Sequence, residues 1–265
     1  MSLENNNSDS DSNLFSFSGS GAVQFLKDKL FGYCKKCGLN PYIREEWKNG
    51  IFQLLGIQTI NFPDLDKKNY ILLSNHISDF DAIILGLLHP KIRIISKIGW
   101  AKNKELMDFL KLHYDIVGIY RDSEIEKLDG EEKKAAKEHN IKININSYKY
   151  LKDTNEAHHL LIFPQGTISD INKNSKERIN PSFARIAEAT NTSLINIFTE
   201  YSSVDGGTRI VFGNPYNITG HNLDYREIWL NDVTALQNQL ENVRKPVLSE
   251  KHSHNNNPDE PFFNG

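Results

Sequence analysis

The sequence lacks the features that would place it in several large protein classes. Only two of its 265 residues are cysteines, which excludes a disulfide framework and indicates a reducing compartment. No apolar run approaches the ~20 residues that a membrane-spanning helix needs. The first residues have neither the basic start nor the apolar stretch of a secretory signal. With a net charge of −3, bulk electrostatics does not indicate nucleic acid as a partner.

The two cysteines, Cys34 and Cys37, stand in a C-x-x-C pattern. This spacing fits half of a zinc site, but no further cysteine exists to complete it and no histidine has a convincing spacing. A redox pair also fits the pattern. Two reduced thiols on one helix are the favoured interpretation, so no metal is expected.

Composition and periodicity predict one sizeable α/β domain. Hydrophobic residues make up 38% and charged residues 25% of the chain, a balance typical of a globular protein with its own core. Segments of strand-like and helix-like period alternate, which predicts a mixed, mostly parallel sheet flanked by helices, with a small N-terminal helical segment. The expected strands are 57–62, 70–73, 91–96, 116–120, 160–163, 194–198 and 208–212. The expected helices are 82–88, 103–112, 124–152 with a break near 140–146, 181–190 and 225–243.

The chain divides into four expected parts. Residues 1–18 are rich in Ser, Asn and Asp and are expected to be disordered, as is the polar tail 249–265. Residues 19–56 form amphipathic helices, and 57–248 form the α/β domain. Lysines interleave with apolar residues in the first of these helices. That pattern fits a helix packed on the domain and equally fits contact with an anionic membrane surface, where each Lys would add ~1 kcal/mol.

A histidine and a carboxylate mark the most informative stretch, Ser74-Asn-His-Ile-Ser-Asp-Phe-Asp81. His76 follows the apolar strand 70–73, and Asp81 falls in the first turn of the next helix. Residues five apart do not share a helix face, so the two meet only if His76 lies outside the helix and turns back over its first turn. An imidazole oriented by a carboxylate is a general base.

The same spacing has a purely structural interpretation. Ser78 and Asp81 fit a capping box, with a hydroxyl at the N-cap and a carboxylate three residues on. Asp81 would then only cap a helix, and His76 would be an ordinary turn residue. On spacing alone this interpretation is favoured about two to one over the general base.

Two further stretches carry possible chemistry at strand ends, where α/β folds place ligands. Arg121 ends the strand 116–120 and suits a phosphate, because its planar fork donates two hydrogen bonds to an oxyanion. An ion pair with Asp122 or Glu124 is the alternative. Phe163-Pro-Gln-Gly-Thr167 follows the next apolar strand. There Gly166 lets the backbone approach a ligand, and its N–H is a candidate donor to developing negative charge.

Taken together and in this order, these blocks resemble the glycerolipid acyltransferase family, the lysophosphatidate acyltransferase-like enzymes with a His-x4-Asp motif. The resemblance runs from about residue 51 to 212. It departs from the family at Gln165, where the family usually has Glu, and at Ile168, where many members have Arg. The resemblance implies His76 and Asp81 as catalytic residues. It implies a substrate-binding set of Asn75, Ser78, Lys97, Arg121, Phe163, Pro164, Gln165, Gly166 and Thr167.

The resemblance further implies transfer of a fatty acyl group from acyl-CoA or acyl carrier protein to a lysophospholipid or glycerol-phosphate-type hydroxyl. No cofactor or metal is implied beyond that co-substrate. The implied partners are membrane lipids and the acyl donor, and the implied location is cytoplasmic and peripheral to a membrane. A non-catalytic lipid-binding relative of the same fold is the alternative function, and a hydrolase that uses the same histidine is a third.

Overall fold

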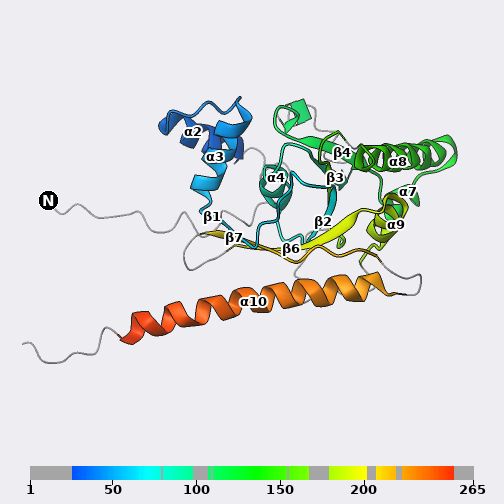
Figure 1. Ribbon diagram of the computed structural model, residues 1–265. Coiled ribbons are helices and arrows are strands. Elements are labelled where there is room, and N and C mark those ends of the chain that lie inside the picture. Colours follow the sequence, from blue (N-terminus) through cyan, green and yellow to red (C-terminus); the bar gives the residue numbers. More distant parts are fainter. Residues whose placement is uncertain are drawn as a thin grey trace, which may run out of the picture.

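The computed structural model describes residues 26–78, 80–97, 107–108, 110–153, 155–166, 179–201, 207–218 and 223–253 (Figure 1). Its named elements are η1 (Leu26–Leu30), α2 (Phe31–Lys36), α3 (Arg44–Leu54), β1 (Ile57–Ile60), β2 (Tyr70–Ser74), α4 (Phe80–Gly86), β3 (Ile92–Lys97), β4 (Asp115–Ile119), α7 (Asp122–Ile125), α8 (Gly130–Leu151), β5 (His159–Ile162), α9 (Ser182–Thr190), β6 (Ser193–Tyr201), β7 (Thr208–Phe212) and α10 (Tyr225–Ser253).

The strands form one seven-stranded sheet in the order β1-β7-β6-β2-β5-β3-β4. All neighbouring strands pair in parallel except β6 and β7, which pair antiparallel. This confirms the expected α/β class, with a mixed and mostly parallel sheet flanked by helices and a small N-terminal helical segment. Because β6, β2, β5, β3 and β4 run in the same direction, their carboxyl ends share one edge of the sheet. The chain segments that leave those five ends are therefore neighbours in space.

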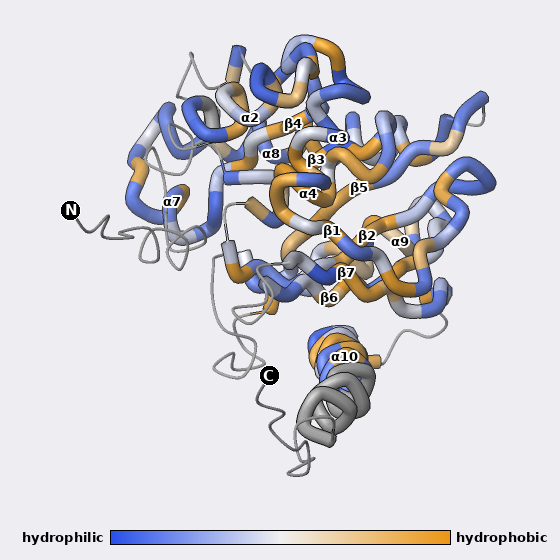
Figure 2. Tube along the Cα trace, turned by 90° about the vertical axis from the view of Figure 1, so that its left-hand side faces the viewer, coloured by the Kyte–Doolittle hydropathy of each residue, from blue (hydrophilic) through white to orange (hydrophobic). Residues whose placement is uncertain are grey.

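Helices cover both faces of the sheet (Figure 1). On one face Leu72 joins a core with α2, α3 and α4; on the other, Ile71 and Leu73 join a core with α9 and α10. Successive side chains of a strand point to opposite faces, so the unbroken apolar run of β2 is what a strand buried on both faces requires. In Figure 2 the hydrophobic colour concentrates on the inner strands.

The N-terminal helices share the core of the sheet's first face. Cys34 and Trp47 are fully buried there, while Cys37, just beyond the end of α2, is exposed. Arg44 of α3 donates hydrogen bonds to the carbonyl oxygens of His113 and of Gly86, the latter at 3.1 Å. Gly86 ends α4, where a cation is favourably placed. Among the described residues, no group of His, Cys, Asp and Glu is arranged to hold a metal ion.

Three elements differ from expectation. The break predicted within 140–146 is wrong: α8 is continuous there, and the helix is interrupted instead between α7 and Gly130. Asn140 stays helical because its side chain pairs with the backbone N–H and C=O of Tyr120 at 2.9 and 2.7 Å. Strand β6 continues past the expected end at 198 to Tyr201, and α10 continues past residue 248 to Ser253.

Some expected features fall outside the described residues. The N-terminal tail that was expected to be disordered lies there entirely, and so do residues 103–106 and 109 of the helix expected at 103–112. Within the described part of the chain, no helix is both long enough and apolar enough to cross a bilayer.

Candidate active site

His76 lies two residues after the end of β2, at the carboxyl edge of the sheet. Its ring stacks on Phe163, which follows the neighbouring strand β5, with the ring centroids 4.3 Å apart. Its Nδ1 lies 3.1 Å from Asp81 Oδ2, and its side chain is 15% exposed. Because the carboxylate can only accept, Nδ1 carries the proton and Nε2 keeps a lone pair. The geometry thus leaves Nε2 as the basic atom of the site.

Asp81 is fully buried and accepts hydrogen bonds on both carboxylate oxygens. Besides His76 Nδ1, its Oδ2 accepts from the backbone N–H of Ile77 at 2.7 Å and of Ser78 at 2.9 Å. Its Oδ1 accepts from the hydroxyl of Tyr201 at 2.6 Å. Ser78 Oγ in turn accepts from the N–H of Phe80 at 3.2 Å. One carboxylate therefore caps α4 and orients His76 at the same time, so the two interpretations of this spacing are both realised.

Asn75 fastens the loop that carries His76 to strand β6. Its side-chain amide donates to the carbonyl oxygen of Thr199 at 2.9 Å, and its Oδ1 accepts from the N–H of Thr199 at 2.7 Å. Both residues are fully buried. Asn75 therefore braces this loop against β6, and its contact with a substrate stays a prediction.

The Phe163–Gly166 stretch forms a hydrogen-bonded turn after β5. Gly166 has φ +67° and donates its N–H to the carbonyl oxygen of Phe163 at 2.9 Å. Proline at the second and glycine at the fourth position favour such a turn. The turn thus uses the N–H of Gly166, the donor that the sequence predicted for developing negative charge, and that role stays a prediction. Pro164 accepts the N–H of Asn180 at 2.8 Å through its carbonyl oxygen.

Gln165 connects this turn to the loop that carries His76. Its side chain is 4% exposed, and its Oε1 accepts the backbone N–H of His76. The amide thus keeps the acceptor that a glutamate would provide at this position, without its charge. Thr167 and Ile168 lie outside the described residues.

Lys97 and Arg121 lie at the same edge but farther along the sheet. Lys97 ends β3 opposite Ile119 of β4, so the two cationic side chains follow neighbouring strand ends. Arg121 is half-buried and Lys97 is exposed. With strands ~4.8 Å apart, β4 lies three spacings, roughly 14 Å, from β2. The alternative, an ion pair of the Arg121 side chain with Asp122 or Glu124, is not formed among the described residues; Glu124 accepts the Arg121 backbone N–H at 2.9 Å instead.

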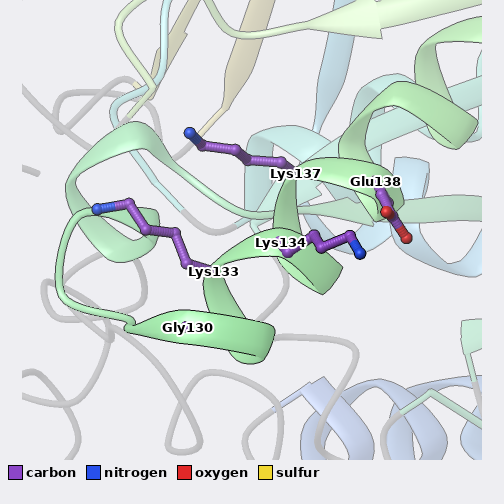
Figure 3. A pocket seen from close by; sticks show the side chains of 5 residues that line it. All are labelled: Gly130, Lys133, Lys134, Lys137 and Glu138. Atoms are coloured by element: carbon purple, nitrogen blue, oxygen red, sulfur yellow. The ribbon is translucent and has the colours of Figure 1, made fainter.

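A hollow of 340 Å³ lies at the first turns of α8, lined by Gly130, Lys133, Lys134, Lys137 and Glu138 (Figure 3). In that view Lys133 and Lys137 extend toward one side, and Lys134 and Glu138 toward the other. The same turns carry Glu131 and Glu132. Mixed charge of this kind gives no preference for an anion, and the hollow lies apart from His76 and Asp81.

Tyr201 is the residue of this site that the sequence did not reveal. It lies 120 residues from Asp81, and the strand containing it was expected to end at 198. A strand extended through Thr199 and Tyr201 was the signal available, because it places both residues at the carboxyl edge. The structure therefore brings together Asn75, His76, Ser78, Asp81, Phe163 and Gln165 as expected, and adds Tyr201.

The site presents a partly buried imidazole, oriented by a fully buried carboxylate, at an edge where several strand-end segments converge. A group of this kind removes a proton from a hydroxyl or from water. The family model described as Acyltransferase matches residues 56–199, more than half of the chain and all of these residues except Tyr201. The chain belongs to the acyltransferase family.

Comparison with curated protein sequences returned no significant match. Among solved structures, the chain is similar to the crystal structure of the 1-acyl-sn-glycerophosphate (LPA) acyltransferase PlsC from Thermotoga maritima. The sequence identity is 15% and the TM-score 0.49, over 88% of this chain and 91% of that chain. A likeness of this size says nothing about the substrate of the present protein.

Proposed function

We propose that the protein is an O-acyltransferase of lipid metabolism. It moves a fatty acyl group from a thioester donor, acyl-CoA or acyl carrier protein, to the hydroxyl of a lysophospholipid or glycerol-phosphate-type acceptor. The observation that carries the proposal is the His76–Asp81 pair, in a chain that belongs to the acyltransferase family.

His76 is the general base in this proposal. Nε2 takes the proton of the acceptor hydroxyl while that oxygen attacks the thioester carbonyl. Collapse of the tetrahedral adduct breaks the C–S bond, and the imidazolium returns its proton to the departing thiolate. Asp81 holds the ring by Nδ1 and stabilises the positive charge that forms on it. No acyl-enzyme is needed, because the acceptor oxygen attacks the donor directly.

Arg121 and Lys97 are the proposed phosphate contacts. Within the described parts of the chain, no carboxylate lies within ion-pair distance of the Arg121 guanidinium. Its charge is therefore available to an anionic group at the sheet edge. A bidentate guanidinium suits a phosphate monoester or diester. Because Arg121 lies some distance from His76, the bound substrate must be extended. Either the acyl acceptor or the acyl donor would lie along the sheet edge, across the ends of β5 and β3.

Peripheral attachment to a membrane is part of the proposal. Lys29, Lys35 and Lys36 are exposed, and the loop before α3 exposes Tyr42 by 66% and Ile43 by 48%. Exposed aromatic and aliphatic side chains, together with exposed lysines, favour the interface of an anionic bilayer. We propose that this side of the N-terminal helices meets the membrane, on the cytoplasmic face.

The test is an acyl-transfer assay with radiolabelled acyl-CoA, acyl carrier protein thioesters and a panel of lysophospholipids in vesicles. We expect His76→Ala to lower the rate ~100- to 10,000-fold. The matched control is His89→Ala, which removes a histidine from the opposite edge of the sheet, where it binds Asp66 at 3.0 Å. We expect that control to stay within about twofold of the wild-type rate.

Three results would contradict the proposal in different ways. Equal rates for the wild type and His76→Ala would refute the role of His76. Binding of lysolipid vesicles without transfer from any donor would favour the lipid-binding alternative. Release of free fatty acid without an acceptor would favour a hydrolase.

A further inference from the structure

The two oxygens of the Asp81 carboxylate are held by different parts of the fold. Among the described residues, the partners of Oδ2 are near neighbours in sequence, namely His76 and the N–H groups of Ile77 and Ser78. Oδ1 binds the hydroxyl of Tyr201 at 2.6 Å, and Tyr201 comes from β6. The residue lies beyond 199, the last residue that the family model matches.

Strand β6 reaches Asp81 because it is longer than its neighbour β2. The two strands pair in parallel from Tyr70 opposite Ser193 to Ser74 opposite Ile197. Beyond that point β2 has ended, and the side chain of Asn75 takes its place by pairing with both backbone groups of Thr199. The end of β6 thus stays fixed against the His76 loop, and Tyr201 is aimed at Asp81.

From this geometry we propose that Tyr201 is a positioning residue of the catalytic pair, acting on His76 through Asp81. The inference rests on the proposed function, in which His76 is the base. The hydroxyl of Tyr201 prevents Oδ1 from being left unpaired in a fully buried place, and so it fixes the rotation of the carboxylate. That rotation keeps Oδ2 on His76 Nδ1. The hydroxyl also draws negative charge away from Oδ2. It thereby weakens the electrostatic attraction between the Asp81 carboxylate and the imidazolium of His76.

A purely structural role for Tyr201 predicts something different. The Tyr201 ring packs against the core on the sheet face that α2, α3 and α4 cover. If the tyrosine only filled space there, its replacement by phenylalanine would lower neither activity nor stability. Tyr201→Phe keeps the ring and removes only the oxygen, so it separates the two roles.

The matched control is Tyr216→Phe. Tyr216 is also half-buried, and its hydroxyl also donates to a side-chain oxygen, Asn196 Oδ1, at 3.3 Å. It bridges to Leu194 near the start of β6, at the opposite end from Tyr201. The two variants therefore delete the same group from the two ends of one strand.

We expect Tyr201→Phe to lower kcat about tenfold, the usual scale for a lost hydrogen bond to a charged group, and to leave both KM values nearly unchanged. The acid limb of its pH–rate profile should move to higher pH, because the carboxylate holds the imidazolium more tightly. Tyr216→Phe should change neither kcat nor the profile. If Tyr201→Phe kept the wild-type kcat and profile, or if Tyr216→Phe changed them equally, the proposal would be refuted.

Action through Asp81 is tested by a double variant. In an Asp81→Asn background, Tyr201→Phe should cost much less than in the wild type, because the group it positions is already altered. Equal costs in both backgrounds would show that Tyr201 acts by another route. Should Tyr201→Phe not fold, fluorotyrosine at position 201 keeps the hydroxyl and strengthens its donation, and the acid limb should then move to lower pH. An unmoved limb would refute the proposal.

One readout does not depend on acyl transfer. The imidazole of His76 is titrated by NMR in the full-length protein, with His76→Ala used to assign its signals. Tyr201→Phe should displace this titration and Tyr216→Phe should not. If no acyl transfer is ever found but the displacement occurs, the proposed function fails and the positioning role stands. If transfer occurs and the titration does not move, only the positioning role fails.

Discussion

At the scale of single residues, the Asp81 carboxylate both caps the start of α4 and orients the ring of His76. The spacing of Ser78 and Asp81 predicted a capping box, and that of His76 and Asp81 a catalytic pair. The hydrogen bonds of both arrangements exist, because one carboxylate oxygen accepts from His76 and from two backbone N–H groups. The catalytic role of the pair belongs to the proposed function. Tyr201 was missed because its strand was expected to end at 198, and spacing along the chain does not pair it with a carboxylate 120 residues away.

Gln165 departs from the family's usual glutamate, and its place in the structure predicts which replacements it tolerates. Gln165→Met keeps the length but removes the acceptor of the His76 N–H, so we expect a loss of ~1 kcal/mol in the free energy of unfolding. Acyl transfer should fall about tenfold as the His76 loop loosens. Gln165→Glu keeps the acceptor and is the matched control. Urea unfolding and the transfer assay measure both, and equal behaviour of the two variants would contradict the role of Oε1.

At the scale of elements, alternation and helical period located the strands and helices well but not their ends. Hydrogen bonds from other elements decide those ends. Asn140 was expected to weaken α8, yet its bonds to Tyr120 keep the helix intact and fasten it to the end of β4. Asn75 likewise extends the pairing of β6 beyond the end of β2. Local propensity does not contain such tertiary contacts.

Gly86 sets how closely α4 approaches the sheet. A Cβ at this position would lie 2.6 Å from Ile94 Cδ1 and 2.9 Å from Tyr114 Cδ1, both too close. Gly86→Ala should therefore destabilise the fold by ~1–3 kcal/mol, as overpacking does. In Gly32→Ala, the control within α2, the new Cβ meets nothing within 4 Å, so it should be neutral or slightly stabilising. Thermal unfolding measures the stability of both variants against the wild type. A Gly86→Ala protein as stable as the wild type would contradict this packing.

At the scale of the whole molecule, the sequence predicted the class of the sheet but not its strand order. The first strand along the chain pairs with the last, since β1 lies beside β7 at one end of the sheet. This pairing places the N-terminal helices on the same sheet face as α4, where they share one core. Arg44 of α3 then donates a hydrogen bond to the carbonyl oxygen of Gly86 at the end of α4. Because contacts of this kind link distant segments, they follow from the assembled core and not from any one segment.

His159 couples the stability of the molecule to pH. It begins β5 fully buried, stacked on Tyr70 and in contact with His89, and burial together with the charge of His89 lowers its pKa to about 3. In the unfolded chain its pKa is ~6.5, so between these values the unfolded state binds the proton and stability falls as pH falls. We expect this histidine to remove about 2 kcal/mol between pH 7 and pH 5. His159→Phe keeps an aromatic ring and should flatten that part of the curve. Urea unfolding at a series of pH values measures the free energy of unfolding of both proteins. If that free energy fell equally in the wild type and in His159→Phe, other groups would be responsible for the pH dependence.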